Sequence, residues 1–139
     1  MLQWQDGVEE VAGVFVRMQV LLLDGQALCY IGDASTPRLD HLAAATPTRF
    51  SPMPSTTALL GQEAPDASDV CSRMAARISH KAKRMIFLSY NLSAADAARV
   101  NTSPEMLEAA VERRVLDAIA LAAALKPPLT TEAPGASVT

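Results

Sequence analysis

The sequence has few of the residue types from which catalytic and metal sites are built. Its 139 residues include two histidines and two cysteines, and aromatic residues make up only 4%. Cys29 and Cys71 are too few for a disulfide framework or a zinc cluster, and the sequence contains no metal-binding or phosphate-binding motif. Each lone histidine, His41 or His80, is more typical of a packed or surface residue than of a base. We therefore expect no metal, no cofactor and no enzymatic activity.

Long apolar runs are also missing. The first six residues lack the basic and apolar segments of a secretory signal. The longest apolar run, from Ala118 to Leu125, has eight residues, whereas a membrane-spanning helix needs about 20. We expect a cytoplasmic protein without membrane contact, and a nuclear pool is left open.

Acidic residues are absent from the segment 70–95. The net charge of the chain is −3, yet the charged residues of this segment are all basic: Arg73, Arg77, Lys81, Lys83 and Arg84. The pattern predicts a basic side of the domain, although a solvated helix face is the simpler interpretation. Because the net charge is negative and aromatic residues are scarce, we do not expect nucleic-acid binding.

Apolar residues make up half of the chain, and their spacing predicts the strands. Alternation over 14–23 predicts a strand that is apolar on both faces near its end, as in a central strand. The turn-forming pair Asp24-Gly25 then leads into a returning strand over 27–32, which makes a hairpin. Residues 39–46 are predicted to be a short strand that forms a second hairpin with the edge strand Ser55–Leu60.

Two main helices are predicted in the second half. Apolar residues at helical spacing predict a helix over 69–82, and a cap followed by proline opens another over 104–125. Between them lie a compact apolar strand at 85–90 and a short helical turn near 94–100. Runs of strands followed by helices indicate an α+β domain with an antiparallel sheet.

The domain organisation follows from the composition at the C-terminus. Lys126-Pro127-Pro128 ends the last helix, and the residues that follow are rich in proline, threonine and alanine. We expect residues 1–126 to form a single domain and residues 127–139 to be a disordered tail.

Four blocks of the sequence resemble the proteasome assembly chaperone 4 family in order and spacing. They are Tyr30-Ile31-Gly32, Pro52 to Gly61 (PMPSTTALLG), Ile86 to Leu92 (IFLSYNL) and Val111 to Val115 (VERRV). The resemblance covers roughly residues 14–120. The chain departs from the family pattern in its alanine-rich stretches, in the loop 62–68 and in the tail after Lys126.

The resemblance implies a non-enzymatic chaperone. Members of the family pair with proteasome assembly chaperone 3, which has a related α+β fold. The pair binds an α-type subunit, the fifth by the family's pattern, and promotes formation of the α-ring of the 20S core particle. Whether the isolated chain is a monomer or a homodimer stays open. The alternatives are a dimerisation or scaffold module of the same fold that serves another complex, and a small enzyme that uses His41 or His80.

Three groups of residues are predicted to bind partners. We expect one sheet face, from strands 14–23 and 26–32, to pack on a partner sheet while the two helices cover the other face. The residues assigned to that partner face are Val14, Val16, Met18 and Val20. The predicted edge strand contributes Ser55, Thr56, Thr57 and Leu59, because unpaired strand edges can accept a further strand. The basic segment contributes Arg73, Arg77 and Lys81, which are expected to meet acidic residues on the α-type subunit.

Overall fold

The structure, a computed structural model, describes residues 3–61 and 65–125. Nine helices and strands follow one another along the described chain: β1 (Gln3–Val11), β2 (Val14–Leu23), β3 (Gln26–Asp33), β4 (Leu42–Thr46), β5 (Ser55–Leu60), α1 (Pro65–Ala82), β6 (Met85–Tyr90), α2 (Ala94–Arg99) and α3 (Pro104–Leu125). The predicted tail 127–139 lies outside the described residues. The first main helix begins at Pro65, a few residues before its predicted start.

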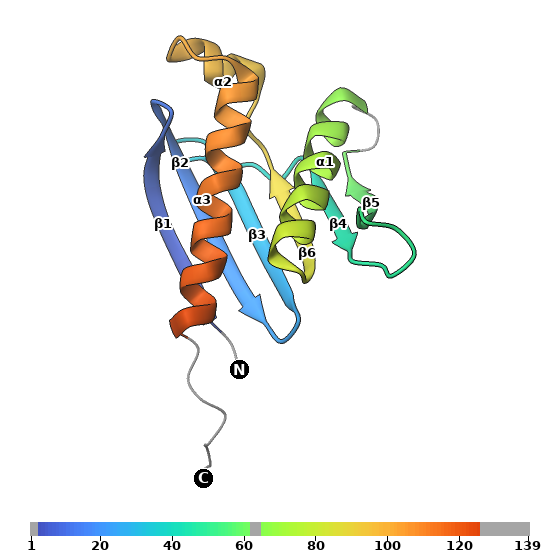
Figure 1. The fold of residues 1–139 in the computed structure, drawn as a ribbon. Coiled ribbons are helices and arrows are strands. Elements are labelled where there is room, and N and C mark those ends of the chain that lie inside the picture. Colours follow the sequence, from blue (N-terminus) through green and yellow to red (C-terminus); the bar gives the residue numbers. More distant parts are fainter. Residues whose placement is uncertain (1–2, 62–64, 126–139) are drawn as a thin grey trace.

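The strands form one six-stranded sheet in the order β1-β2-β3-β6-β4-β5. Figure 1 shows α1 and α3 side by side on the same face of this sheet, α3 over β1 and β2 and α1 over β6 and β4. The α+β class is therefore confirmed. Both predicted hairpins are confirmed as well, since β2 pairs antiparallel with β3 and β4 with β5.

The sheet is mixed, and the prediction of a wholly antiparallel sheet is wrong for one pair. β6 pairs antiparallel with β4 on one side and parallel with β3 on the other. The chain leaves β5 and returns through α1, so that β6 runs in the same direction as β5 and takes a central place. Its continuous apolar run, Met85 to Leu88, suits a strand with neighbours on both sides.

The first strand, β1, was not predicted. It pairs antiparallel with β2 along its whole length, through a two-residue turn in which Ala12 and Gly13 both have positive φ, 51° and 90°. That conformation suits the right-handed twist of a hairpin. Glycine and acidic residues, which are poor strand formers, hide the strand in the sequence: Asp6, Gly7, Glu9 and Glu10.

The core lies between the sheet and the two long helices. Its largest fully buried side chains come from both layers, with Ile31, Ile86 and Leu88 from the sheet and Met74 and Ile78 from α1. On α3 the buried stripe is Leu107, Val111, Val115, Ile119 and Ala122. The described part of the chain contains no helix that is both long and apolar enough to cross a membrane.

The short helix α2 connects β6 to α3 and confirms the helical turn predicted near residues 94–100. It begins with a reciprocal cap, in which Ser93 Oγ accepts a hydrogen bond from the backbone N–H of Asp96. The carboxylate of Asp96 accepts one from the backbone N–H of Ser93 in return. Arg99 at its end bonds Asp33 of β3 at 2.9 Å, which ties the connection to the sheet.

Candidate protein–protein interface

The predicted partner-facing residues of β2 lie on the wrong face of the sheet. Four alternate side chains of this strand are buried in the core beneath the helices: Val14, Val16, Met18 and Val20. They are therefore not accessible to a partner in this structure. Because the other alternate set includes Arg17 and Gln19, covering that set would bury two strongly polar groups, and the helices cover the purely apolar set instead.

The face of the sheet that carries no helix presents a row of apolar side chains. Leu21 of β2 lies opposite Leu28 of β3. Phe87 of β6 lies opposite Leu28 on one side and opposite Ala44 of β4 on the other. Directly opposed residues point to the same side of a sheet, so these four side chains form one apolar row across four strands. We call this set the apolar row.

Side chains of the apolar row are open to solvent. Leu28 is 41% exposed and Leu21 and Phe87 are partly exposed, while Phe15 on the same face of β2 is 62% exposed. An apolar set that crosses several strands without a covering layer is typical of a surface that another protein covers.

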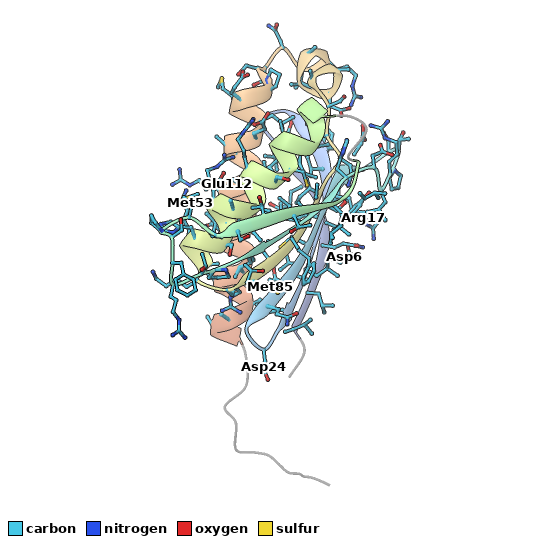
Figure 2. The ribbon with its side chains drawn as sticks, turned by 90° about the vertical axis from the view of Figure 1, so that its right-hand side faces the viewer. Asp6, Arg17, Asp24, Met53, Met85 and Glu112 are labelled. Atoms are coloured by element: carbon cyan, nitrogen blue, oxygen red, sulfur yellow. The ribbon has the colours of Figure 1, made fainter. Side chains whose placement is uncertain are left out.

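Polar and charged side chains lie next to the apolar row on the same face. Arg17 of β2 bonds Asp6 of β1 at 2.8 Å, and Gln19 lies opposite Asp6. Figure 2 shows Asp6 and Arg17 on the side of the sheet away from the helices, with Glu112 among the helices. Along β2, the polar side chains of Arg17 and Gln19 thus lie between the apolar row and Phe15 on the same face, and such an arrangement would favour one orientation of a bound partner.

The predicted edge residues lie on an edge. β5 is the outermost strand beside β4, and Ser55, Thr56, Thr57 and Leu59 are all exposed. The prediction of an edge strand at Ser55–Leu60 is confirmed. Whether a partner contacts it stays a prediction.

The three predicted basic contact residues, Arg73, Arg77 and Lys81, all interact with other groups of the chain. Arg77 Nε and Lys81 Nζ of α1 lie 2.6 Å and 2.9 Å from the two carboxylate oxygens of Glu112 on α3. Burial alone would raise the pKa of Glu112, but the hydrogen bonds from Arg77 and Lys81 outweigh it and hold the pKa below its usual value. Arg73 is exposed and acts electrostatically on Glu108.

The basic side of α1 therefore belongs to a groove of mixed charge. The groove has a volume of about 530 Å³ and runs between α1 and α3. It is lined on the α3 side by Glu105, Glu108, Glu112 and Arg113. Because the three acids offset the field of the basic residues, an acidic residue of another protein would have to compete with Glu112 for Arg77 and Lys81.

Groups with reactive side chains are dispersed or engaged in packing. Burial raises the pKa of the Cys29 thiol to about 12 and also raises the pKa of Cys71, whose thiol donates to the backbone oxygen of Leu88. His41 and His80 line different cavities. Among residues 3–61 and 65–125, no group of three or more His, Cys, Asp or Glu side chains is placed to hold a metal ion.

The cavity beside His41 has a polar frame made by one buried amide. It has a volume of about 410 Å³ and lies between the start of α3 and the end of β6. Asn91 Oδ1 accepts the backbone N–H groups of Asp40 and His41, and Asn91 Nδ2 donates to the backbone oxygen of Ile31 and to Ser89 Oγ. All the hydrogen-bonding groups of this side chain are thereby used to hold loops and strands together.

Comparison with known proteins gives concordant results. The chain matches the family described as proteasome assembly chaperone 4 over residues 16–92. Proteins named proteasome assembly chaperone 4 from Mus musculus and Homo sapiens are 36% and 35% identical to it over 83 residues. The matched region covers 59% of this chain and spans 63% of the length of each of these relatives.

The fold is also similar to a solved structure. A chain in the crystal structure of a chaperone complex for yeast 20S proteasome assembly superposes with a TM-score of 0.63 at 17% identity. The superposition covers 86% of this chain and 96% of that one. The sequence match 16–92 includes the apolar row and β5, whereas β1 and α3 lie outside it.

Proposed function

The chain belongs to the proteasome assembly chaperone 4 family, and from this premise we propose that it acts by binding other proteins during assembly of the 20S core particle. In this proposal it pairs with a related chaperone of the proteasome assembly chaperone 3 type. The pair then binds an α-type subunit, the fifth by family pattern, and promotes formation of the α-ring. The chain performs no catalysis in this process, and the process takes place in the cytoplasm, with the nucleus as a second location.

The observation that carries the proposal is the uncovered apolar row on the sheet. A sheet of a soluble domain normally either exposes one polar face to water or is covered on both faces. Here Leu21, Leu28 and Phe87 form a contiguous apolar set on the uncovered face. A partner sheet packed at about 10 Å would cover this set.

A chaperone of related fold suits this face for two reasons. Its own helix-free sheet face would present the same kind of flat apolar surface, and two such faces make a sandwich. The yeast protein of similar fold was solved as part of a chaperone complex, which agrees with a chaperone partner here. Isolated chains would then form homodimers or remain marginally stable, because no natural partner covers the row.

Reconstitution tests the proposed activity. The full chain is co-expressed with a proteasome assembly chaperone 3 and the complete set of α-type subunits, and α-rings are counted by native mass spectrometry. We expect the yield of α-rings to rise several-fold when both chaperones are present. Equal yields with and without the chain would contradict the proposal.

The main alternative is a scaffold module of the same fold that serves another complex. The same reconstitution separates the two. A scaffold of another complex would pair with the related chaperone but bind no α-type subunit. The family match favours the proteasome function over this alternative.

A further inference from the structure

The cavity beside His41 lies on the side of the sheet that carries the helices. Its volume is about 410 Å³, and its lining comes from α1, the start of α3, the end of β6 and the loop before β4. Figure 1 shows the starts of both helices and the end of β6 at the same end of the sheet. The cavity is therefore separate from the uncovered face that carries the apolar row.

Part of the cavity wall is apolar. Leu92, just after β6, and Leu107 of α3 are 8% and 1% exposed, and Val70 of α1 and Pro104 of α3 lie beside them. Contact with such a wall is favourable for aliphatic groups, which leave water when they bind. The wall therefore suits the aliphatic part of an occupant.

The hydroxyl of Tyr90 is a polar group of this cavity that has no partner. Tyr90 is 5% exposed and lines the cavity, and its hydroxyl forms no hydrogen bond with any described residue. Burial, together with the negative charges of Glu108 and Asp96, raises the pKa of this phenol, which therefore stays protonated. The hydroxyl of Tyr30, in contrast, donates to the backbone oxygen of Arg38 at 2.7 Å. Because buried tyrosine hydroxyls usually have a partner, the Tyr90 hydroxyl is available to an occupant of the cavity.

Glu108 adds an unpaired carboxylate to the same cavity. It is partly buried and forms no ion pair or hydrogen bond with any described residue, whereas Glu112, one turn later on α3, bonds two basic side chains. Burial raises the pKa of Glu108, and the attraction of Arg73 and Arg77 does not offset it. A cation that reached this carboxylate would form a charge-assisted hydrogen bond with it.

The other charged groups of the described lining are paired with each other. Arg38 Nε lies 3.5 Å from Asp40 Oδ2, and the two side chains are 50% and 49% exposed. Their charges cancel, and with His41 neutral the described lining keeps only the negative charge of Glu108. The cavity is therefore complementary to an occupant that is aliphatic along its length and positive at one end.

We propose that this cavity binds a basic side chain, arginine or lysine, of the α-type proteasome subunit. The aliphatic stem packs against Leu92 and Leu107, and the charged end donates to the carboxylate of Glu108 and to the hydroxyl oxygen of Tyr90. This inference rests on the proposed function and adds the location and chemistry of one client contact.

The position of the cavity favours the client over the related chaperone as the source of this side chain. In the proposed function the related chaperone packs on the uncovered sheet face, and the cavity lies on the face that carries α1 and α3. A protein that binds the assembled pair can reach the cavity from that side, whereas the related chaperone would have to extend around the edge of the sheet.

Three conservative substitutions test the inference in the intact chaperone pair. Glu108→Gln removes only the charge, and Tyr90→Phe removes only the hydroxyl. The control, Glu105→Gln, removes an exposed charge about one turn earlier on α3, in the groove but not in the cavity. Each α-type subunit is titrated into the pair by calorimetry. For the subunit that the wild-type pair binds, we expect Glu108→Gln to weaken binding about tenfold or more, Tyr90→Phe about fivefold and Glu105→Gln less than about twofold.

The variant Tyr90→Phe distinguishes the cavity from the groove between α1 and α3. Glu108 lines both, whereas Tyr90 lines only the cavity. If Glu108→Gln weakens binding while Tyr90→Phe binds like wild type, the subunit uses the groove and the inference is wrong.

Stability and pairing provide a second readout for the same variants. Because the Tyr90 hydroxyl has no partner in the described chain, we expect Tyr90→Phe to keep the urea midpoint of wild type. We also expect each variant to pair one-to-one with the related chaperone. A lower midpoint for Tyr90→Phe would show that the chain itself uses the hydroxyl, and loss of pairing would show that the related chaperone occupies the cavity. Either result would overturn the inference.

A double-mutant cycle identifies the basic side chain. Exposed arginines and lysines of the bound subunit are changed one at a time to methionine, and each change is combined with Glu108→Gln. We expect one of them to weaken binding to the wild-type pair about tenfold and to add less than about twofold to the loss caused by Glu108→Gln. Losses that multiply independently at every position would contradict the inference.

The outcomes separate the inference from the proposed function. If an α-type subunit binds wild type, Glu108→Gln and Tyr90→Phe equally well, the inference is wrong and the proposed function stands. If no α-type subunit binds the chaperone pair, both are wrong.

Discussion

Glu112 joins the two long helices through a single carboxylate. It is buried on α3 and accepts hydrogen bonds from Arg77 and Lys81 of α1. A buried carboxylate stabilises the fold only while both donors, Arg77 and Lys81, stay within hydrogen-bond distance of it. Two basic residues of the segment 70–95, Arg77 and Lys81, thus have a structural role, because they join α1 to α3 through Glu112.

We predict that Glu112→Gln lowers the free energy of unfolding by about 1–2 kcal/mol at neutral pH, since the donors are partly exposed to water. The pKa of Glu112 is below its ordinary value of 4.5 in the folded state. Its contribution is therefore complete above that ordinary value and is lost as pH falls through the lower folded pKa. Urea unfolding of both proteins between pH 3 and pH 7, a range of roughly four units, measures the difference.

The control for this prediction is Asp117→Asn, an exposed acid on the same helix. We expect it to change stability by less than about 0.5 kcal/mol at every pH. A stability gap between wild type and Glu112→Gln that grows as pH falls below 4.5 would contradict the assignment.

The two cysteines are predicted to be unreactive in the folded protein. Burial raises the pKa of Cys29 to about 12, so almost no thiolate is present at pH 8. An aromatic disulfide reagent should label neither thiol within minutes in buffer and both thiols in denaturant. Rapid labelling of Cys29 in the native protein would show that the core between sheet and helices opens readily.

At the residue scale, the sequence contains enough information to assign the two faces of β2, although alternation alone does not. Both alternate sets are apolar near Leu21–Leu23, so the pattern by itself leaves the covered face undecided. Arg17 and Gln19 decide it, because a polar pair is costly to bury beneath helices. The prediction that Val14, Val16, Met18 and Val20 face a partner is wrong, because the helices cover this purely apolar set and leave Arg17 and Gln19 on the other face.

At the scale of elements, the strongly periodic segments were predictable and the charged edge strand was not. Apolar spacing and turn residues predict the two hairpins, α3 and the residue range of β6. The strand β1 pairs with β2 despite its acidic residues, since an edge strand tolerates charge and takes its stability from its neighbour. The parallel pairing of β3 with β6 depends on the path of α1, which local sequence does not specify.

Two glycines with positive φ, one after β5 and one in the turn between β2 and β3, give a prediction at this scale. Gly61 follows β5 with φ of +92°, and a Cβ there would collide with His41 Nδ1 and lie 2.8 Å from the backbone oxygen of Asp40. Gly25, with φ of +71°, has open space around the same position. We predict that Gly61→Ala costs about 2–4 kcal/mol and Gly25→Ala about 1 kcal/mol.

Urea midpoints of the two alanine variants measure this difference. The matched substitution separates backbone strain, which both share, from the collision, which only Gly61→Ala suffers. Equal losses would mean that the loop around His41 moves away without cost, and that the end of β5 is held less firmly than the structure indicates.

At the scale of the whole molecule, the sheet has one covered and one uncovered face, and we propose that this small protein with few aromatic residues binds its partner through the uncovered face. The helices bury one set of side chains to make the core. The apolar row on the other face has no cover within the described chain. The chain belongs to the proteasome assembly chaperone 4 family, and in our proposal the uncovered sheet face is the surface on which a partner packs.

We predict that the dissociation constant of a chaperone pair formed through this face depends only weakly on salt concentration. In the proposed pair the apolar row would contribute most of the contact, and Arg17 and Asp6 already form an ion pair with each other within the chain at 2.8 Å. Raising the salt concentration from 0.05 to 0.5 M, roughly tenfold, should therefore change the dissociation constant of the chaperone pair by less than about tenfold. A steeper loss, measured by titration calorimetry, would show that charged groups dominate the contact.

The most direct test of the account is the mass of the complex formed with a proteasome assembly chaperone 3 by wild type, Leu28→Glu and Leu121→Glu, measured by sedimentation equilibrium. Leu28 lies in the apolar row and Leu121 on the outer side of α3, at 41% and 54% exposure. We expect a one-to-one complex for wild type and Leu121→Glu and roughly hundredfold weaker pairing for Leu28→Glu, because a carboxylate would be buried without a partner. Pairing of a folded Leu28→Glu variant as tight as that of wild type would contradict the central claim that the uncovered sheet face binds the partner.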